Sequence, residues 1–273
     1  MSSTLTVAAY AFKDAIRSKW LIIFAILFFL IAINLPVIAL HQGGYLPPNY
    51  LTEFIPDIIA LSFPFIPLLA LPMGSPVIVD ERETGTLQFV LSNPLSRNEY
   101  LAGKFLGMLG ATTAVVAGGF GISAIVTYGT NLSLYNQIIP VIAIAAVLNF
   151  IMLGIAIAIS IRIKRKITAL TAGIFVWFLF SVVSNYSLLG SSLATSRQLG
   201  LATILILLNP VESTKTVAVL NLTSDPGQLG ISGLILENVL GSSASEIVLI
   251  SLAIWAVALT LICFVLFRSQ DAV

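Results

Sequence analysis

Long apolar stretches recur along the whole sequence, separated by shorter polar segments. A helix needs about 20 apolar residues to cross the hydrocarbon core of a bilayer. Helices also satisfy their own backbone hydrogen bonds, which lipid cannot do. The pattern therefore predicts an all-α integral membrane protein with six transmembrane helices in a single domain, residues 1–273. The six stretches are residues 20–41, 53–79, 101–128, 137–161, 167–190 and 246–267.

The segment before the first span, residues 1–19, has a helical pattern of its own. Apolar residues recur there at helical spacing, while Lys13, Asp14 and Arg17 occupy the other face. We expect a helix that lies in the membrane interface, and a plain cytoplasmic helix end is the alternative. Asp14 interrupts the basic region and the next apolar run is too long for a secretory signal, so we expect the segment to be retained.

The second apolar stretch contains five prolines, each of which removes a backbone donor that lipid cannot replace. We therefore expect this helix to be kinked and packed against protein. Whether the kink is a functional hinge or a passive feature stays open. The prolines are Pro56, Pro64, Pro67, Pro72 and Pro76.

Residues 191–245 separate the last two spans and contain an apolar run from Leu199 to Leu208 that is only about half a span long. If this run were a seventh crossing, the two chain ends would lie on opposite sides of the membrane. We interpret it as a re-entrant or interfacial element. The turn-rich remainder, residues 209–245, is expected to form a small helical cap at the outer face.

The composition agrees with a membrane protein. Hydrophobic residues make up 58% of the chain and charged residues 9%, with a mean hydropathy of +1.03. Soluble domains carry about 25% charged residues, so a water-soluble fold is excluded. The net charge of +1 gives no electrostatic basis for binding nucleic acid. The single cysteine, Cys263, lies in an apolar run and is read as a packed or lipid-facing residue.

The basic residues predict the orientation of the chain. With the N-terminus in the cytoplasm, six spans leave only Arg197 and Lys215 outside, and the other eleven lysines and arginines lie inside or at the inner boundary. Basic residues concentrate on the cytoplasmic side of membrane proteins. We therefore expect a multi-pass protein of the cytoplasmic (inner) membrane with both termini in the cytoplasm.

Residues 80–100 form the largest cytoplasmic loop in this topology. Its acidic cluster, Asp80, Glu81 and Glu83, lies where a helix N-terminus would favour negative charge. The short helix that follows has an apolar face made of Leu87, Val90 and Leu91, and Pro94 ends it. A helix this short is marginal alone in water, so it either docks in a groove of a partner or packs back on the membrane surface. Ser96 and Glu99 have the spacing of a capping box that opens the third span.

Small residues recur along the third span at spacings of three or four, at Gly110, Ala114, Gly118 and Gly121. Such a strip allows another helix to approach closely. The approaching helix can belong to a second subunit or to the same chain, and packing within one chain is the more common case.

Three kinds of chemistry find little support in the sequence. The one Gly-Lys pair, Gly103-Lys104, lacks the first glycine and the Ser or Thr of a P-loop, with Asn98 and Phe105 at those positions. The spans contain almost no ionisable residues that could relay a coupling ion. A copper relay would need soft ligands, and the chain has one histidine (His41), one cysteine and four methionines.

Residues 80–104, DERETGTLQFVLSNPLSRNEYLAGK, resemble the cytoplasmic signature of ABC-2 type permeases, the membrane subunits of ATP-binding-cassette transporters. In that family an acidic E-x-x-x-G-T-L run forms a coupling helix, and S-R-x-E-x-x-x-G-K leads into the third span. The chain size and the run from Asn209 to Glu212 look most similar to the NosY group, whose members serve copper-site assembly of nitrous oxide reductase.

The resemblance implies a permease rather than an enzyme. ATP and Mg would bind a separate nucleotide-binding subunit, and no cofactor is expected in this chain. The assembly would contain two such ATPases and two permeases, the second being another copy of this chain or a related one, enclosing a path for export. An ion-coupled secondary transporter and a membrane scaffold without transport are the alternatives. The residues implied to seat in the ATPase are Glu81, Glu83, Thr84, Gly85, Thr86, Leu87 and Leu91.

Overall fold

The structure, a computed structural model, describes residues 3–43, 56, 59–92, 95–128, 135–183, 196–220 and 230–269. Within these ranges the chain is helical except at short turns, and it contains no strand. The first half comprises α1 (Ser3–Arg17), α2 (Lys19–Gly43), α4 (Phe65–Gly74), α5 (Val77–Glu83), α6 (Thr86–Leu91) and α7 (Arg97–Tyr128). The second half comprises α8 (Tyr135–Arg162), α9 (Lys166–Phe178) with a π-helical turn (Leu179–Val183), α11 (Ser196–Leu208), α12 (Pro210–Leu220), α13 (Gly230–Leu240), a 3₁₀ turn (Gly241–Ser243) and α14 (Ala244–Ser269).

Among the described residues, four helices are long and apolar enough to cross a bilayer, and the number rises to six if each of two bent helix pairs is one span. One pair is α1 with the first part of α2, bent by 65°, and the other is α11 with α12, bent by 100°. The expected fifth span corresponds to a shorter apolar helix, Lys166–Val182, and residues 184–190 lie outside the described part. The all-α multi-pass architecture is thus confirmed, while the count of six remains a prediction. The four long helices are Ile59–Glu83, Arg97–Val126, Ile138–Arg162 and Ser232–Ser269.

The proline-rich second span is broken, as its sequence predicts. α4 contains Pro72 and ends at Gly74, and α5 begins at Val77 after a turn at Ser75 and Pro76. Of the most apolar window of this span, 72% is buried, against 22% to 50% for the other three long helices. Protein therefore surrounds the helix whose backbone hydrogen bonds the prolines interrupt.

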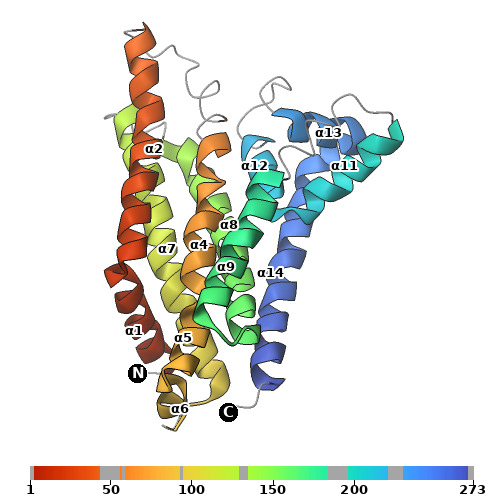
Figure 1. The fold of residues 1–273 in the computed structure, drawn as a ribbon. Coiled ribbons are helices and arrows are strands. Elements are labelled where there is room, and N and C mark those ends of the chain that lie inside the picture. Colours follow the sequence, from red (N-terminus) through yellow and green to blue (C-terminus); the bar gives the residue numbers. More distant parts are fainter. Residues whose placement is uncertain are drawn as a thin grey trace.

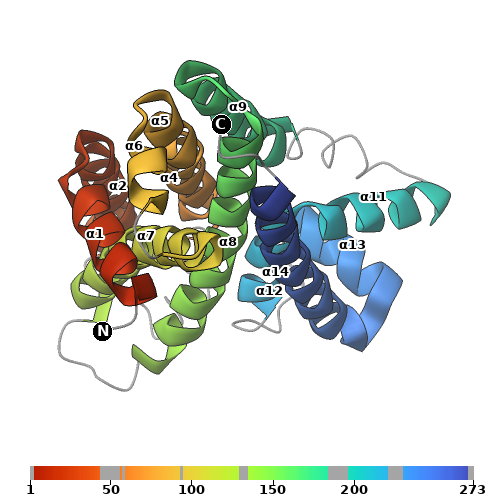
Figure 2. The same cartoon turned by 90° about the horizontal axis from the view of Figure 1, so that it is seen from below.

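α8 lies at the centre of the bundle, where it contacts α4, α7, α9, α12 and α14 (Figure 2). Its Asn149 is buried and donates hydrogen bonds to the hydroxyls of Thr112 and Thr113 on α7, both at 2.8 Å. Polar side chains that pair across helices stabilise packing inside a membrane, where unpaired ones are costly.

The glycines of α7 bring α1 and α2 close to it. A side chain on Gly107 would lie 2.3 Å from the carbonyl oxygen of Ala8 in α1, so only glycine fits there. Gly110 and Gly118 lie against aromatic side chains of α1 and α2, respectively, whereas Gly121 has open space beside it. The small-residue strip thus serves packing within one chain at two of its positions.

Both chain ends and α6 lie at one end of the bundle, and α11 and α13 lie at the other (Figure 1). We call these the α6 end and the α13 end. Most of the loops expected at the outer face, residues 42–52 and 129–136, fall outside the described ranges. The arrangement agrees with an even number of crossings between the two chain ends.

The segment between the last two spans differs from the expected surface cap. Of α12, residues Pro210 to Val219 are buried, with Lys215 the partly exposed exception. α11 and α12 meet at a sharp bend at Asn209 and α12 packs against α8 and α14. The charged and hydroxyl side chains of α12 resemble surface residues in the sequence, but they find partners within the protein.

Candidate functional site

A turn at Thr84 and Gly85 joins α5 to α6 and forms the tip of the α6 end (Figure 1). Gly85 has a φ of +75°, in the left-handed region that favours glycine. The hydroxyl of Thr84 donates to the carbonyl oxygen of Asp80 at 2.9 Å and lies 3.0 Å from the hydroxyl of Thr86. The turn is therefore held by its own residues, and all three of Thr84, Gly85 and Thr86 are exposed.

The charged residues of α5 bind the loop between α8 and α9. Arg82 donates to the carbonyl oxygens of Ile161 and Ile163 at 3.3 to 3.4 Å, at the end of α8 where carbonyls lack helical partners. Glu83 accepts a hydrogen bond from the backbone nitrogen of Lys166 at 3.1 Å, at the start of α9. A cation at a helix C-terminus and an anion at a helix N-terminus are both favourable. The two side chains thus cap two different helices.

Asp80 and Glu81 extend this cluster. Asp80 forms an ion pair with the ammonium of Lys166, 2.8 Å away. Glu81 pairs with Lys104 and accepts a hydrogen bond from the hydroxyl of Tyr100, both on α7. Lys104 is only 4% exposed, so this ion pair ties α5 firmly to α7.

The acidic residues were expected at the N-terminus of the short helix, and the structure places them elsewhere. They lie on α5, before the turn, and do not sit at the N-terminus of α6. Their partners are α7 and the α8–α9 loop, so the four residues Asp80 to Glu83 join three helices at one point. We call these four residues the α5 hub.

The apolar face of α6 is also turned inward. Leu87 is 5% exposed and belongs to the hydrophobic core, and Val90 packs against the same core. Phe89, in contrast, is 74% exposed at the tip. Leu91 is the last residue of α6, and its side chain lies outside the described part of the structure. The sequence pattern did not predict that Phe89 is exposed, because its exposure depends on the direction in which the turn orients α6.

The predicted capping box is present. The backbone nitrogen of Ser96 donates to the carboxylate of Glu99 at 2.9 Å, and the backbone nitrogen of Glu99 donates to the hydroxyl of Ser96 at 3.2 Å. These two bonds fix the start of α7 about one turn before Tyr100 and two turns before Lys104, the two residues that contact Glu81 of the α5 hub.

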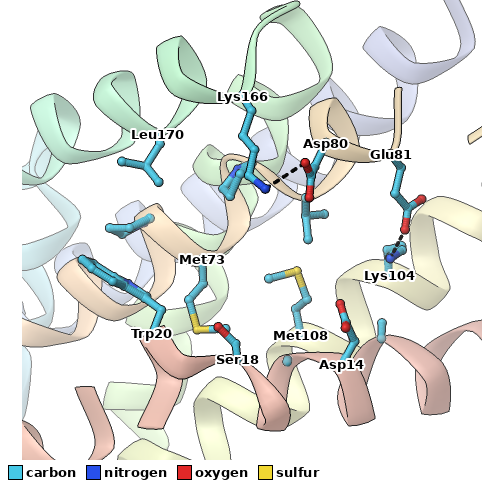
Figure 3. Close-up of a pocket in the computed structure, with 15 residues that line it drawn as sticks. Asp14, Ser18, Trp20, Met73, Asp80, Glu81, Lys104, Met108, Lys166 and Leu170 are labelled. Atoms are coloured by element: carbon cyan, nitrogen blue, oxygen red, sulfur yellow. Dashed lines mark ion pairs between the residues drawn. The ribbon is translucent and has the colours of Figure 1, made fainter. Parts of the chain in front are cut away.

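A cavity of about 300 Å³ lies beside the α5 hub, between α1, α4, α5, α7 and α9 (Figure 3). Asp14, Asp80, Glu81, Lys104 and Lys166 line its polar side. Trp20, Met73, Met108 and Leu170 contribute apolar surface, together with the prolines of the α4–α5 break. No group of three or more histidine, cysteine or carboxylate side chains with metal-binding spacing occurs in the described ranges.

A second polar cluster, at the bend between α11 and α12, was not expected from the sequence. The side chain of Asn209 accepts a hydrogen bond from the backbone nitrogen of Val211 at 2.9 Å and donates to the carbonyl oxygen of Phe180 at 2.9 Å. Glu212 is 2% exposed, and it pairs with Lys215 at 2.6 Å. The hydroxyl of Ser232 on α13 donates to the same carboxylate at 2.9 Å. The spacing of three residues between Glu212 and Lys215 is compatible with a pair, but burial could not be inferred from it.

Together these features define a multi-pass helical membrane protein with a compact charged hub at the end that carries both termini. The comparison with known families makes the assignment more specific. Residues 5–272 match the family model described as ABC-2 family transporter protein. Since the match covers almost the whole chain, the protein belongs to the ABC-2 family of transporters.

Two relatives bear the name probable ABC transporter permease protein NosY. The one from Pseudomonas aeruginosa is 28% identical, with the alignment covering 97% of this chain and 98% of the relative. The one from Stutzerimonas stutzeri is 26% identical over 86% of this chain and 87% of the relative. The similarity thus extends over whole chains and is not confined to the motif of residues 80–104.

Proposed function

We propose that this chain is the membrane-spanning permease subunit of an ABC-2 type transporter. It couples ATP hydrolysis in a separate nucleotide-binding subunit, where ATP and Mg bind, to export or to mechanical work across the cytoplasmic membrane. The observation that carries the proposal is the exposed tip of α5 and α6 joined to a hub that contacts three membrane helices. Family membership supports the same reading.

In this proposal α6 is the coupling helix, and the residues of the motif divide into two roles. Thr84, Gly85 and Thr86 are exposed and, with Phe89, meet the ATPase subunit directly. Glu81, Glu83 and Leu87 act from the other side, because they anchor α5 and α6 to the rest of the permease. Leu91 closes α6 at its last residue.

The assembly is proposed to contain two permeases and two ATPase subunits. One chain supplies a single α5–α6 tip, whereas the family engine uses two ATPases. The second permease is another copy of this chain or a related one. Both termini and α6 lie in the cytoplasm in this arrangement, as the eleven basic residues favour.

The similarity to NosY proteins favours one alternative, a permease that serves copper-site maturation of nitrous oxide reductase. An adjacent gene for that reductase would favour this role, and a lone ATPase gene would favour a general exporter. An ion-coupled secondary transporter is the weaker alternative. Its best candidate for a buried ionisable group is Glu212, and that carboxylate is already paired with Lys215.

The proposal is tested at Phe89. An exposed aromatic residue in the centre of a docking surface contributes about 2 kcal/mol or more to binding. Phe89→Ala is therefore expected to weaken capture of the ATPase subunit by about thirtyfold or more. The change should leave the permease fold intact because the side chain is 74% exposed and lies outside the hydrophobic core. Co-purification with the ATPase and stimulation of its turnover are the measurements.

Leu5→Ala provides the matched control. Leu5 is also apolar and exposed, at 57%, but it lies on α1 at the same end of the bundle. It should leave ATPase capture unchanged. Equal capture and equal turnover in the Phe89→Ala variant and the wild type would reject α6 as the coupling helix.

A further inference from the structure

The cavity beside the α5 hub has one strongly charged side. Three carboxylates, from Asp14, Asp80 and Glu81, face two ammonium groups, from Lys104 and Lys166 (Figure 3). The charged groups come from four separate elements, α1, α5, α7 and α9. Formal charges around the cavity therefore sum to one negative charge, which favours a cationic group inside it.

Internal pairing leaves a single carboxylate available. Lys104 pairs with Glu81, and Lys166 pairs with Asp80 at 2.8 Å. Among the described residues, the side chain of Asp14 has no ion-pair or hydrogen-bond partner. Lys166 is 47% exposed and has three N–H donors, of which the pair with Asp80 uses one. The cavity thus offers a free acceptor on one side and free donors on another.

The opposite side of the cavity is apolar. Trp20, Met73 and Leu170 line it, and Trp20 lies at the start of α2, just after the 65° bend from α1. Tryptophan at the first residues of a span is typical of the boundary between water and hydrocarbon. A small hydrophilic ion would leave this apolar wall in contact with water, whereas an amphiphile would cover it.

We propose that this cavity binds the phosphoethanolamine headgroup of a membrane phospholipid. The primary ammonium donates to Asp14, the phosphate accepts from Lys166, and the first part of the acyl chains lies beside Trp20 and Leu170. A cavity of about 300 Å³ is at the lower end of the size of ligand pockets. The site shares Asp80 and Glu81 with the α5 hub, but lipid binding there requires neither the ATPase subunit nor a transported substrate.

The close fit of α1 against α7 makes the site possible. Gly107 allows the backbone of α1 to pack directly on α7, which fixes the helix that carries Asp14 relative to Lys104. The lipid would therefore bind a preformed site whose charged groups do not have to be brought together.

The test compares phospholipids that differ only in the headgroup. Full-length permease, stripped of lipid in detergent, is titrated with ethanolamine, choline and glycerol phospholipids of identical acyl chains, and bound lipid is counted by native mass spectrometry. A primary ammonium donates hydrogen bonds to a carboxylate and a quaternary one does not. We expect the ethanolamine lipid to bind about tenfold more tightly than the choline lipid.

Asp14→Asn should remove this preference. The residue is exposed and unpartnered, so the variant should fold like the wild type. Glu237→Gln is the matched control, a carboxylate changed to an amide at an exposed position of α13 at the other end of the bundle, and it should keep the preference.

Three results would overturn the proposal. The first is equal binding of the ethanolamine and choline lipids by the wild type, which decides the question without any variant. The second is an unchanged preference in Asp14→Asn. The third is displacement of the lipid by glycerophosphoethanolamine, which has the headgroup without the chains, at the same concentration as by the intact lipid, because the ligand would then be a soluble amine phosphate.

Discussion

Gly85 influences the turn between α5 and α6 through its backbone conformation alone. Its φ of +75° is unfavourable for any residue with a side chain, yet the space around it is empty. A side chain at this position would not clash with neighbouring residues. A substitution there would therefore change only the preferred backbone conformation of the turn. The turn sets the direction in which α6 leaves α5, so backbone preference at one residue controls the orientation of the proposed coupling helix.

We predict that Gly85→Val destabilises the turn by about 1–2 kcal/mol, the cost of a left-handed conformation for a residue with a side chain. The ATPase should then be stimulated less, while the membrane helices stay folded. Thermal unfolding of the purified permease and turnover of the bound ATPase check the two parts. Gly121→Val is the control, since Gly121 also has open space but lies inside α7 without a positive φ. Normal ATPase stimulation by Gly85→Val would show that the turn geometry does not matter.

The charged motif of residues 80–104 identifies the candidate site in the sequence, but the contacts of its side chains could not be predicted from the motif. The loop, its short helix and the capping box of Ser96 and Glu99 follow from local spacing, and the structure has all three. The partners of Arg82 and Glu83 lie about 80 residues away in the chain. No local pattern predicts such contacts, because they depend on how α5 packs between α7 and the α8–α9 loop.

The N-terminal helix α1 is an integral part of the bundle. Its apolar residues follow a helical pattern that the sequence predicts, and Leu5, Tyr10 and Ile16 remain exposed. Its opposite side packs on the glycines of α7 with backbone contact. A helix held in this way moves with α7, which itself carries Lys104, the ion-pair partner of Glu81 in the α5 hub.

We predict that Gly107→Leu separates α1 from α7, since even a Cβ atom there would lie 2.3 Å from a backbone carbonyl oxygen. Overpacking of this kind costs about 1–3 kcal/mol. Limited proteolysis should then cleave between α1 and α2 faster than in the wild type. Gly121→Leu should leave the rate unchanged because its surroundings are open. Protection of α1 in both variants would contradict a backbone contact.

The two elements with the strongest local signals differ in how well they could be predicted. The prolines of residues 53–79 require a kink, and the break at Ser75 and Pro76 follows from them. The polar residues of α12 suggested an exposed helix, but it is buried. Glu212 pairs with Lys215, and the hydroxyls of Thr214 and Thr216 donate to backbone carbonyl oxygens of α12 itself. Polar residues are buried where they have hydrogen-bond or ion-pair partners, and local sequence does not predict those partners.

For the whole molecule, both chain ends and α6 share one end of the bundle (Figure 1). The distribution of basic residues predicts that this end faces the cytoplasm. The fold does not determine which side of the membrane the α6 end faces, since the same helices could be inserted in either direction.

We predict the orientation from single-cysteine labelling in intact cells. Cys263 is buried and is the only native cysteine, so Cys263→Ala provides a clean background. An impermeant thiol reagent should modify Glu237→Cys at the α13 end and not Phe89→Cys at the α6 end. Permeabilised cells should show labelling at both positions, which controls for reactivity. Modification of Phe89→Cys in intact cells would reverse the topology.

α9 links the two polar clusters of the molecule. It begins at Lys166, where Glu83 of the hub binds its first backbone nitrogen, and it continues into the π-helical turn Leu179–Val183. In that turn, 14 residues after Lys166, the carbonyl oxygen of Phe180 accepts a hydrogen bond from Asn209. A helix of that length spans about 21 Å and is stiff along its axis. An axial displacement imposed on α9 at the α6 end would therefore reach the bend between α11 and α12 nearly undiminished. The protein thus contains a stiff helical connection between the α5 hub and the bend at Asn209.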